Sequence, residues 1–101
     1  MLIVGGIYES TVMMDAVFIY LCEKDNIYYG VDIINEKLNS NKLVEDFIYD
    51  KIKSNSTYGL CYRSILQEKD FDINGGYLGR INKDLYNYLL KILYKSGVWI
   101  K

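Results

Sequence analysis

The chain has 101 residues, half of them hydrophobic by type and a quarter charged, and this balance is typical of one globular domain over residues 1–101 rather than of a disordered segment. Its 12 Lys and Arg and 13 Asp and Glu leave a net charge of -1, which excludes a protein whose overall field attracts nucleic acid or anionic lipid. The chain has 0 His, so it cannot build Ser-His-Asp triads, Cys-His dyads, histidine metal sites or a histidine general base.

The two cysteines and the apolar runs indicate the cellular compartment of the protein. Cys22 and Cys61 lack the CxxC spacing of zinc ribbons and redox pairs, and no secretory signal precedes them. The alternatives are a disulfide and two buried free thiols, and we expect the free thiols, in a cytoplasmic protein with no metal and no cofactor. The longest mostly apolar run, Val12 to Cys22, is interrupted by Asp15 and is shorter than the roughly 20 residues that span a bilayer, so no membrane association is expected.

The first third of the chain predicts three strands. Leu2 to Glu9 has the pattern of a short strand with a bend or bulge at Gly5-Gly6. Ala16 to Glu23 is a nearly continuous apolar run, which is typical of a strand buried on both faces. Ile27 to Ile34 alternates with a period of two, and a turn over residues 23–26 separates it from the preceding run. The two runs together predict an antiparallel hairpin.

Two amphipathic helices are predicted from apolar stripes at helical spacing. The first runs from Lys42 to Lys53, with Ser40 or Asn41 as its N-cap. The second follows an N-cap at Asn82 and ends before Gly97, a typical residue just beyond a helix C-terminus. The stripes expected to be buried are Leu43, Val44, Phe47, Ile48 and Ile52 in the first helix, and Leu85, Leu89, Ile92 and Leu93 in the second.

The segment between the helices predicts further short strands. Thr57 to Ile65 alternates again, and Asn74-Gly75 is a hairpin signal between Phe71–Ile73 and a strand from Tyr77 to Ile81. Val98 to Ile100 is expected to form a final strand or a packed tail. Many short strands with few helices predict an α+β fold: a small antiparallel sheet, curled or closed into a barrel, with one inserted helix and a C-terminal helix.

Three segments resemble the PemK/MazF family of toxin ribonucleases. Arg63-Ser64-Ile65 is similar to the Arg-Thr-Ile strand of that family, and Leu78-Gly79-Arg80-Ile81-Asn82, followed by a helix, is similar to its Ile/Leu-Gly-Arg/Lys-Leu-Ser segment. Gly6-Ile7-Tyr8 looks like the start of its first strand. The resemblance implies an SH3-like barrel that dimerises, and a metal-independent endoribonuclease of a toxin-antitoxin pair that uses the RNA 2′-hydroxyl as its nucleophile.

The sequence departs from the family at the residues that carry the reaction. The resemblance implies an Arg in the loop after the first strand and a Ser or Thr after the third. Here the loop from Ser10 to Asp15 contains neither Arg nor Lys, and Ile33-Ile34-Asn35 stands in place of the family's Pro-Ile-Thr. Because RNA cleavage of this kind needs a cation beside the scissile phosphate, the resemblance supports the fold better than the reaction.

Six residues are candidates for a site. Arg63 and Thr11 are the catalytic candidates, with Arg63 as the best available phosphate-contacting cation, since the chain has only two arginines. Each candidate also has a structural interpretation. Arg63 is then a surface or paired arginine, Arg80 the ion-pair partner of Asp84 or Asp72, and the hydroxyl side chains are turn residues. Asn35 then ends a strand, and Asp15 lies at a buried edge of the core. The candidates for binding are Ser10, Asp15, Asn35 and Arg80.

Two functions stay open from the sequence. The first is an endoribonuclease that acts on RNA and is held by a cognate antitoxin. The second is a non-catalytic inhibitor from a phage or plasmid, of the anti-defence or anti-CRISPR kind, that docks on a protein target; the missing loop cation and the 11 Tyr favour it, although an AT-rich genome also explains abundant Tyr. An antitoxin or immunity protein would differ only in its partner. An exposed stripe from Tyr88 or Trp99 would indicate a homodimer.

Overall fold

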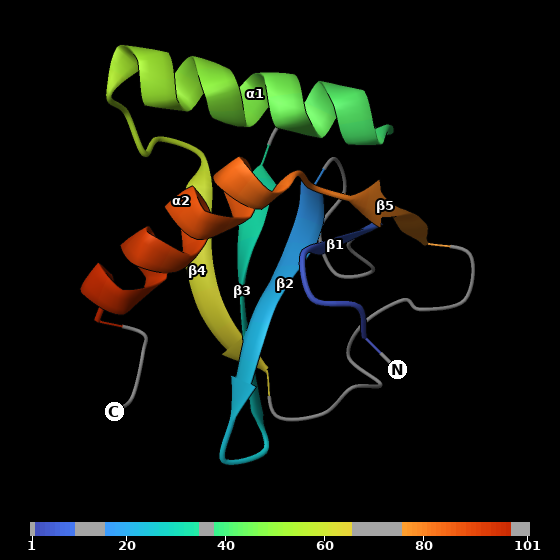
Figure 1. Cartoon of the computed structure of the whole chain (residues 1–101), viewed down its shortest axis with the longest axis vertical. Helices are drawn as coiled ribbons and strands as arrows, with labels where there is room; N and C mark the ends of the chain where they lie inside the picture. Colours follow the sequence, from blue (N-terminus) through green and yellow to red (C-terminus); the bar gives the residue numbers. More distant parts are fainter. Residues whose placement is uncertain (1, 10–15, 35–37, 66–75, 98–101) are drawn as a thin grey trace.

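The order of helices and strands matches the predicted α+β class. The computed structural model describes residues 2–9, 16–34, 38–65 and 76–97 (Figure 1). The helix expected between the third and fourth strands and the C-terminal helix are both confirmed. The predicted Phe71–Ile73 strand, the Asn74-Gly75 turn and the tail from Val98 lie outside the described residues. The elements are β1 (Gly6–Glu9), β2 (Ala16–Lys24), β3 (Ile27–Ile34), α1 (Asn41–Ser54), β4 (Leu60–Ile65), β5 (Tyr77–Arg80) and α2 (Lys83–Lys95).

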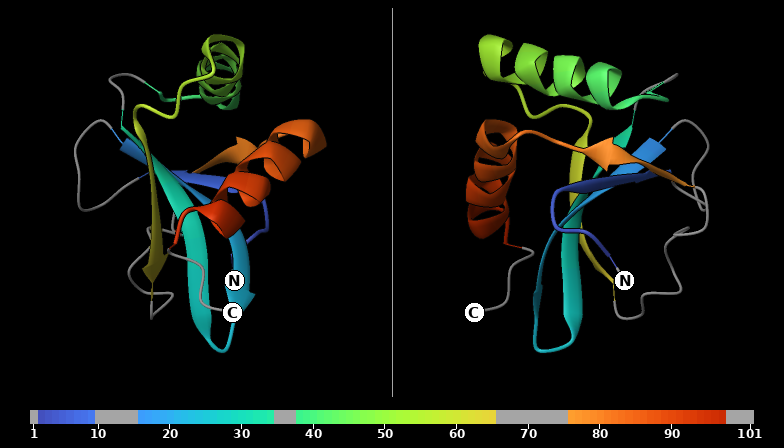
Figure 2. Two further views of the ribbon diagram at one scale, coloured as in Figure 1. Left: turned by 90° about the vertical axis from the view of Figure 1, so that its left-hand side faces the viewer. Right: turned by 45° about the vertical axis from the view of Figure 1, so that its right-hand side comes forward.

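The five strands form one open antiparallel sheet in the order β4-β3-β2-β1-β5. Strands β4 and β5 are the two opposite edges of this described sheet, so the prediction of a closed barrel is wrong. The physical reason lies in how the apolar faces are covered. The amphipathic faces of both helices pack on one face of the sheet (Figure 2), so that face is buried without the edges having to meet.

The hairpin of β2 and β3 is confirmed, with a tighter turn than predicted. Only Asp25 and Asn26 connect the strands, and both have positive φ, 53° and 65°. Two such residues make the turn type whose twist matches that of the flanking strands, and Asp and Asn tolerate this conformation. Residues 16–21 of β2 are all buried, as expected for a strand covered on both faces.

The first strand is shorter than the predicted Leu2 to Glu9 because the chain turns at Gly5. Gly5 has a φ of 79°, and the Gly6 N–H donates to the Ile3 carbonyl oxygen over 2.8 Å, so β1 begins only at Gly6. The expected bend at the glycines is therefore a turn before the strand. An irregularity of the β1–β5 ladder follows within the strand, where the register with β5 shifts between Ile7 and Tyr8.

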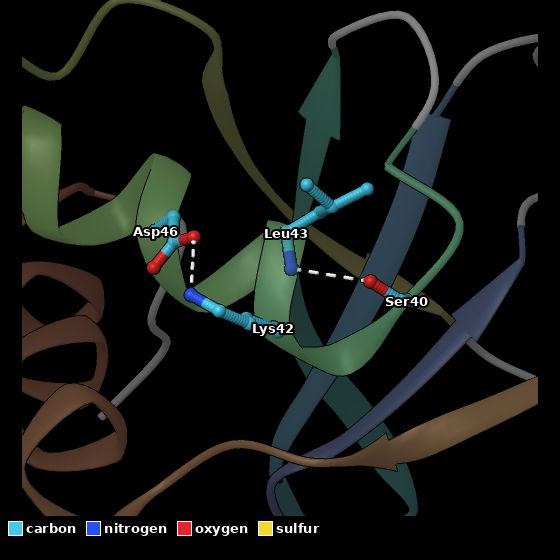
Figure 3. A network of polar contacts seen from close by, with 4 residues as sticks. All are labelled: Ser40, Lys42, Leu43 and Asp46. Atoms are coloured by element: carbon cyan, nitrogen blue, oxygen red, sulfur yellow. Dashed lines mark hydrogen bonds and ion pairs between the residues drawn. The ribbon is translucent and has the colours of Figure 1, made fainter.

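Both helices begin and end close to the predicted residues. The Ser40 hydroxyl accepts a 3.3 Å hydrogen bond from the Leu43 N–H at the start of α1 (Figure 3). In the same turn, Lys42 Nζ lies 3.0 Å from Asp46 Oδ2. Asn82 Oδ1 accepts from the Leu85 N–H over 2.9 Å at the start of α2. Gly97, just beyond α2, has the positive φ expected there.

The main core lies between one face of the sheet and the two helices. α2 lies along this face and buries three leucines, whereas α1 crosses the end of the sheet and buries only Val44 and Ile48 (Figure 2). Part of each predicted stripe is therefore wrong: Leu43 and Ile52 are exposed, and Phe47 and Ile92 are half-buried. The fully buried residues of this core are Ile7, Ile19, Leu21, Val31, Ile33, Val44, Ile48, Leu85, Leu89 and Leu93.

A second, smaller cluster occupies the opposite face of the sheet. It contains Leu2, Tyr8, Phe18, Tyr20 and Ile65, with Tyr28 packed against it. Tyr20 and Tyr28 meet edge to face with ring centroids 5.9 Å apart, a favoured geometry for aromatic pairs. Burial is the main cause that raises the pKa of Tyr20 to about 12, with the nearby Glu23 as a further cause. Arg63, the catalytic candidate on β4, lies on this face.

Candidate functional site

Arg63, the predicted catalytic cation, lies on the second face of the sheet. Its neighbour across the ladder on β3 is Gly30, and Asp32 is paired with the nearby Cys61. Because side chains alternate along a strand, Arg63 points away from the core face to which Tyr62 belongs. The period-two alternation of Thr57 to Ile65, read from the sequence alone, predicts the same orientation for Arg63.

Arg63 forms an ion pair with Asp32, whose carboxylate Oδ2 contacts the guanidinium Nε. Asp32 is only 6% exposed and is the one buried charged residue in the part of the chain that the structure describes. Burial raises the pKa of Asp32 above its usual value, and the Arg63 guanidinium opposes that rise. The carboxylate therefore depends on Arg63 to be accommodated in its charged form.

The ring of Phe18 completes this cluster. Phe18 is paired with Asp32 across the β2–β3 ladder, and its ring centroid lies 4.8 Å from Arg63 Cζ. An arginine over an aromatic face gains cation–π attraction, which is stronger where water is excluded. The Phe18 ring itself is buried. The Arg63 guanidinium is thus held by a carboxylate on one strand and a ring on the next.

This arrangement bears on the chemistry available to Arg63. A cation that stabilises a scissile phosphate must present its charge and its N–H donors to the substrate. In this structure the buried carboxylate of Asp32 neutralises the charge of Arg63, and the Arg63 side chain is only 34% exposed. Arg63 is therefore a paired arginine in this structure, and its catalytic role stays a prediction. The pairing and register of β3 and β4 bring Asp32 and Arg63 into contact, and the sequence patterns did not predict this contact.

Arg80, the other arginine, lies at the far edge of the sheet on β5. Its Nε donates to the Val4 carbonyl oxygen over 3.0 Å, and its own carbonyl oxygen accepts a 2.6 Å hydrogen bond from the Asn41 side chain. Within residues 76–97 it forms no ion pair with Asp84, so that predicted pairing is wrong; Asp72 lies outside the described residues. Because β4 and β5 are opposite edges, the two arginines do not converge on one site.

The remaining candidates fall where the structure gives no description. Ser10, Thr11, Asp15 and Asn35 all lie outside the described residues, and their roles stay predictions. Over the described ranges, no group of three Cys, Asp or Glu side chains is placed to hold a metal ion. The same ranges contain no helix with the length and apolar character needed to cross a membrane.

The two cysteines differ in exposure. Both are free thiols; Cys22 is half-buried and Cys61 is exposed. The expectation of two buried thiols is wrong for Cys61, which lies on the edge strand β4. Burial raises the pKa of Cys22, so its thiol stays protonated near neutral pH and is a weak nucleophile.

An exposed apolar corner lies where α1 meets the ends of β3 and β4, and the sequence patterns did not predict it. We define this α1–β4 corner by Ile34, Leu43, Phe47 and Tyr58. Leu43 and Phe47 are one turn apart on α1, and the Ile34 N–H donates to the Gly59 carbonyl oxygen over 3.0 Å. Leu43 and Phe47 were expected in the core. Because α1 crosses the end of the sheet, Leu43 is exposed and Phe47 packs against the core with only part of its ring.

Tyr58 and Lys51 make the α1–β4 corner both aromatic and positively charged. Tyr58 is 84% exposed, the largest exposure among the described large hydrophobic side chains. Lys51 Nζ lies 5.0 Å from the ring centroid of Phe47 and 5.4 Å from that of Tyr58. One ammonium group therefore bridges two aromatic rings on the surface, which leaves a positive charge at the centre of an apolar patch.

Comparison with known proteins adds no relative to this description: the chain matches no protein-family model, no curated protein and no solved structure.

Proposed function

We propose that this protein is a non-catalytic inhibitor that docks on a protein partner through the α1–β4 corner. The observation that carries the proposal is this corner itself, in which Tyr58 is almost fully exposed beside the half-buried Phe47. Tyrosine combines a large contact area with a polar tip, and it is enriched among the residues that dominate binding energy at interfaces. Ile34 and Leu43, each 43% exposed, extend the apolar area around it.

The state of Arg63 weighs against the alternative, RNA cleavage by a PemK/MazF-like mechanism. Arg63 is the cation that the resemblance offers for contact with phosphate, and its charge is compensated by Asp32. Its guanidinium also lies on the Phe18 ring. Releasing Arg63 toward a substrate would leave a buried carboxylate without a partner, which is costly. A structural role for the Arg63–Asp32 pair is therefore consistent with a protein that binds a partner and catalyses no reaction.

The resemblance to the PemK/MazF family enters the proposal as a hypothesis about the fold. The segment Arg63-Ser64-Ile65 lies in β4, and Leu78-Gly79-Arg80 lies in β5 directly before α2. A strand, a second short strand and a closing helix in this order support a distant relation to those toxins, with an opened sheet in place of the barrel. A binding protein built on a toxin-like fold accounts for this order without a preserved reaction.

The charge of the corner indicates the chemistry of the partner. Lys51 places a positive charge between the exposed Tyr58 ring and the half-buried Phe47 ring. A complementary partner surface presents a carboxylate to Lys51 and an apolar recess to Tyr58. We therefore propose an acidic patch around a hydrophobic pocket as the docking site on the partner.

The test is site-specific photocrosslinking in the cells that carry this protein. A photoreactive phenylalanine analogue replaces Tyr58 in one variant and Tyr94, 48% exposed on α2, in the matched control. We expect one stoichiometric crosslinked protein from position 58 and none from position 94. Lys51→Glu should abolish that crosslink, because it reverses the charge at the centre of the corner.

Two outcomes would overturn the proposal. Crosslinks of equal yield from both positions would show that the corner is not a specific interface. Cleavage of mixed-sequence RNA by the purified protein, lost in a folded Arg63→Lys variant, would show that the protein is an endoribonuclease and that Arg63 acts in the reaction.

A further inference from the structure

A pocket of about 380 Å³ lies between the segment before β1 and the start of α2. Three hydrogen bonds hold its walls together: Ile81 N–H to the Gly5 carbonyl oxygen at 3.0 Å, Arg80 Nε to the Val4 carbonyl oxygen at 3.0 Å, and the Tyr86 hydroxyl to the Leu21 carbonyl oxygen at 2.6 Å. The pairing of β1 with β5 brings these distant segments side by side (Figure 2). The lining residues are Val4, Gly5, Arg80, Ile81, Lys83, Tyr86 and Asn87.

The absence of a side chain at Gly5 keeps the floor of this pocket open. A Cβ at position 5 would lie 3.4 Å from Arg80 Cγ, 3.6 Å from Tyr86 Cδ1 and 3.8 Å from an Ile81 side-chain carbon. These are ordinary contact distances, so a larger side chain would fill the space between the three residues. Gly5 also has a φ of 79°, a conformation that other residues adopt only at a cost. Position 5 thus shapes both the turn and the pocket.

The pocket carries two cations and no carboxylate. Arg80 and Lys83 are both exposed, and neither forms an ion pair with any carboxylate of the described ranges. The Nε of Arg80 donates to the Val4 carbonyl oxygen. The two terminal amino groups of Arg80 have no hydrogen-bond partner among the residues described, and they are available to a ligand. Asn87 adds an amide, while Val4, Ile81 and Tyr86 form the apolar part of the wall. The lining therefore combines a charge of about two with an apolar surface.

We propose that this Arg80–Lys83 pocket binds a phosphate monoester attached to a nucleoside-sized apolar or aromatic body. A phosphate monoester carries a charge of about -1.5 to -2 near neutral pH, which matches two cations better than a single carboxylate does. The planar arginine and the compact lysine charge are both typical phosphate ligands. The volume falls at the lower end of the range of about 300–1,000 Å³ for small-molecule sites.

This proposal is independent of docking through the α1–β4 corner. The pocket is built from the segment before β1 and from the β5–α2 end of the chain, whereas the corner belongs to α1, the end of β3 and the residues before β4. The phosphate group has two sources, a free nucleotide or the 5′-phosphate at the end of an RNA strand. The chemistry recognised is the same, and the experiment separates the two.

The experiment titrates the full chain with adenosine 5′-monophosphate, adenosine and inorganic phosphate, and follows backbone amide NMR signals and calorimetric heats. We expect the monophosphate to shift the amides of Ile81, Tyr86 and Asn87 and to bind at least about tenfold more tightly than adenosine, since a charged hydrogen-bonding group is lost in adenosine. A matched pair of RNA oligonucleotides, with and without a 5′-phosphate, then tests the RNA source. Tighter binding of the phosphorylated strand than of the mononucleotide would identify an RNA end as the ligand.

Two variants of equal charge change test the residues. Lys83→Gln should weaken binding of the monophosphate about tenfold, because it removes one of the two positive charges of the pocket. The variant should still fold, since Lys83 forms no ion pair with the residues described. Lys91→Gln, on α2 but outside the pocket lining, should change it less than about twofold at the same ionic strength. Arg80→Gln should weaken binding further, with folding checked by circular dichroism. Equal affinity for adenosine and its monophosphate, or an equal effect of Lys83→Gln and Lys91→Gln, would overturn the proposal.

Discussion

The aromatic ring of Phe18 covers Gly30 on the neighbouring strand β3, two residues from Asp32, its partner across the ladder. A Cβ built at position 30 would overlap the Phe18 ring and the carbonyl oxygen of Ile19. The second of these is backbone in the centre of the sheet, so it cannot move aside as a flexible side chain would. The same ring also supports the Arg63 guanidinium. The absence of a side chain at Gly30 is thus a condition for the whole Phe18–Asp32–Arg63 cluster.

Gly30→Ala should destabilise the protein by about 3 kcal/mol, because the new methyl group must displace a buried ring or a strand. Urea unfolding followed by circular dichroism measures this difference. Gly97→Ala is the control: nothing lies within 4 Å of a Cβ there, and only the positive φ of 81° opposes the substitution. That control should cost about 1 kcal/mol. Equal losses for the two variants would contradict the close packing of Phe18 on Gly30.

The stability of the protein should depend on pH through Asp32. Burial raises the pKa of Asp32 in the folded protein, so the folded state binds its proton more tightly than the unfolded state does. The contribution of Asp32 to stability is therefore fully present below its unfolded pKa and is lost as the pH rises through its folded pKa. Relative to Asp32→Asn, the wild-type protein should become less stable over this window as the pH increases.

Urea unfolding of both proteins at a series of pH values from about 3 to about 7 tests this direction, with a slope of at most about 1.4 kcal/mol per pH unit. Asp50→Asn, at an exposed position of α1, is the matched control. A difference between wild type and Asp32→Asn that grows in favour of the wild type with rising pH would contradict the raised pKa.

Arg63→Ala should destabilise the protein by about 2 kcal/mol near neutral pH. Removing the partner of a buried carboxylate is costly, and the value is reduced here because Arg63 is partly exposed to water. The loss should shrink in acid, where Asp32 is protonated and needs no cation. Unfolding at two pH values, together with the Asp32→Asn/Arg63→Ala double variant, measures the coupling. A loss that is independent of pH would show that Arg63 stabilises through packing alone.

The N-cap of α2 should matter more than the N-cap of α1. The Asn82 side chain accepts from Leu85 and donates to the Tyr49 hydroxyl at 2.9 Å, and its backbone N–H donates to Glu45 Oε2 at 2.7 Å. Asn82→Ala removes both side-chain bonds and should cost about 2 kcal/mol, against about 1 kcal/mol for Ser40→Ala. Thermal unfolding of the two variants measures this ranking. A larger loss for Ser40→Ala would contradict the role of Asn82 in joining the two helices.

Tyr58→Ala should leave stability within about 0.5 kcal/mol of the wild type, because the side chain is almost fully exposed. Its cation–π contact with Lys51 is a surface contact and contributes little. Urea unfolding checks this expectation. A near-zero effect makes any loss of partner binding by Tyr58→Ala a direct effect on the interface. A loss above about 2 kcal/mol would instead show that Tyr58 is part of the folded core.

Local sequence signals predicted the elements well because each signal acts over a few residues. The caps at Ser40 and Asn82 and the turn at Asp25 depend only on neighbouring backbone groups, and the structure has them where expected. The alternation in Thr57 to Ile65 also predicted the correct face for Arg63. The barrel was wrong because closure depends on which strands pair, and β1 pairs with β5, more than seventy residues later, as its register with residues 77–80 shows.

The candidate site was harder to predict because it depends on contacts between distant segments. The partner of Arg63 is set by the register between β3 and β4, which no local pattern contains. The exposed corner follows from the direction in which α1 crosses the sheet, since an amphipathic stripe at Leu43 and Phe47 looks the same whether or not the sheet extends beneath it. The pocket beside Gly5 exists only because β5 returns to β1.

The place of β1 between β2 and β5 has a consequence for how the chain is made. Among the strands that the structure describes, its residues are synthesised first, yet one of its two hydrogen-bonding edges is filled by β5, the last of these strands along the chain. Until then, the nascent protein exposes a strand edge that another chain can pair with. Slow translation of the second half should therefore favour aggregation on the ribosome, and a chaperone that shields this edge should increase the yield of folded protein.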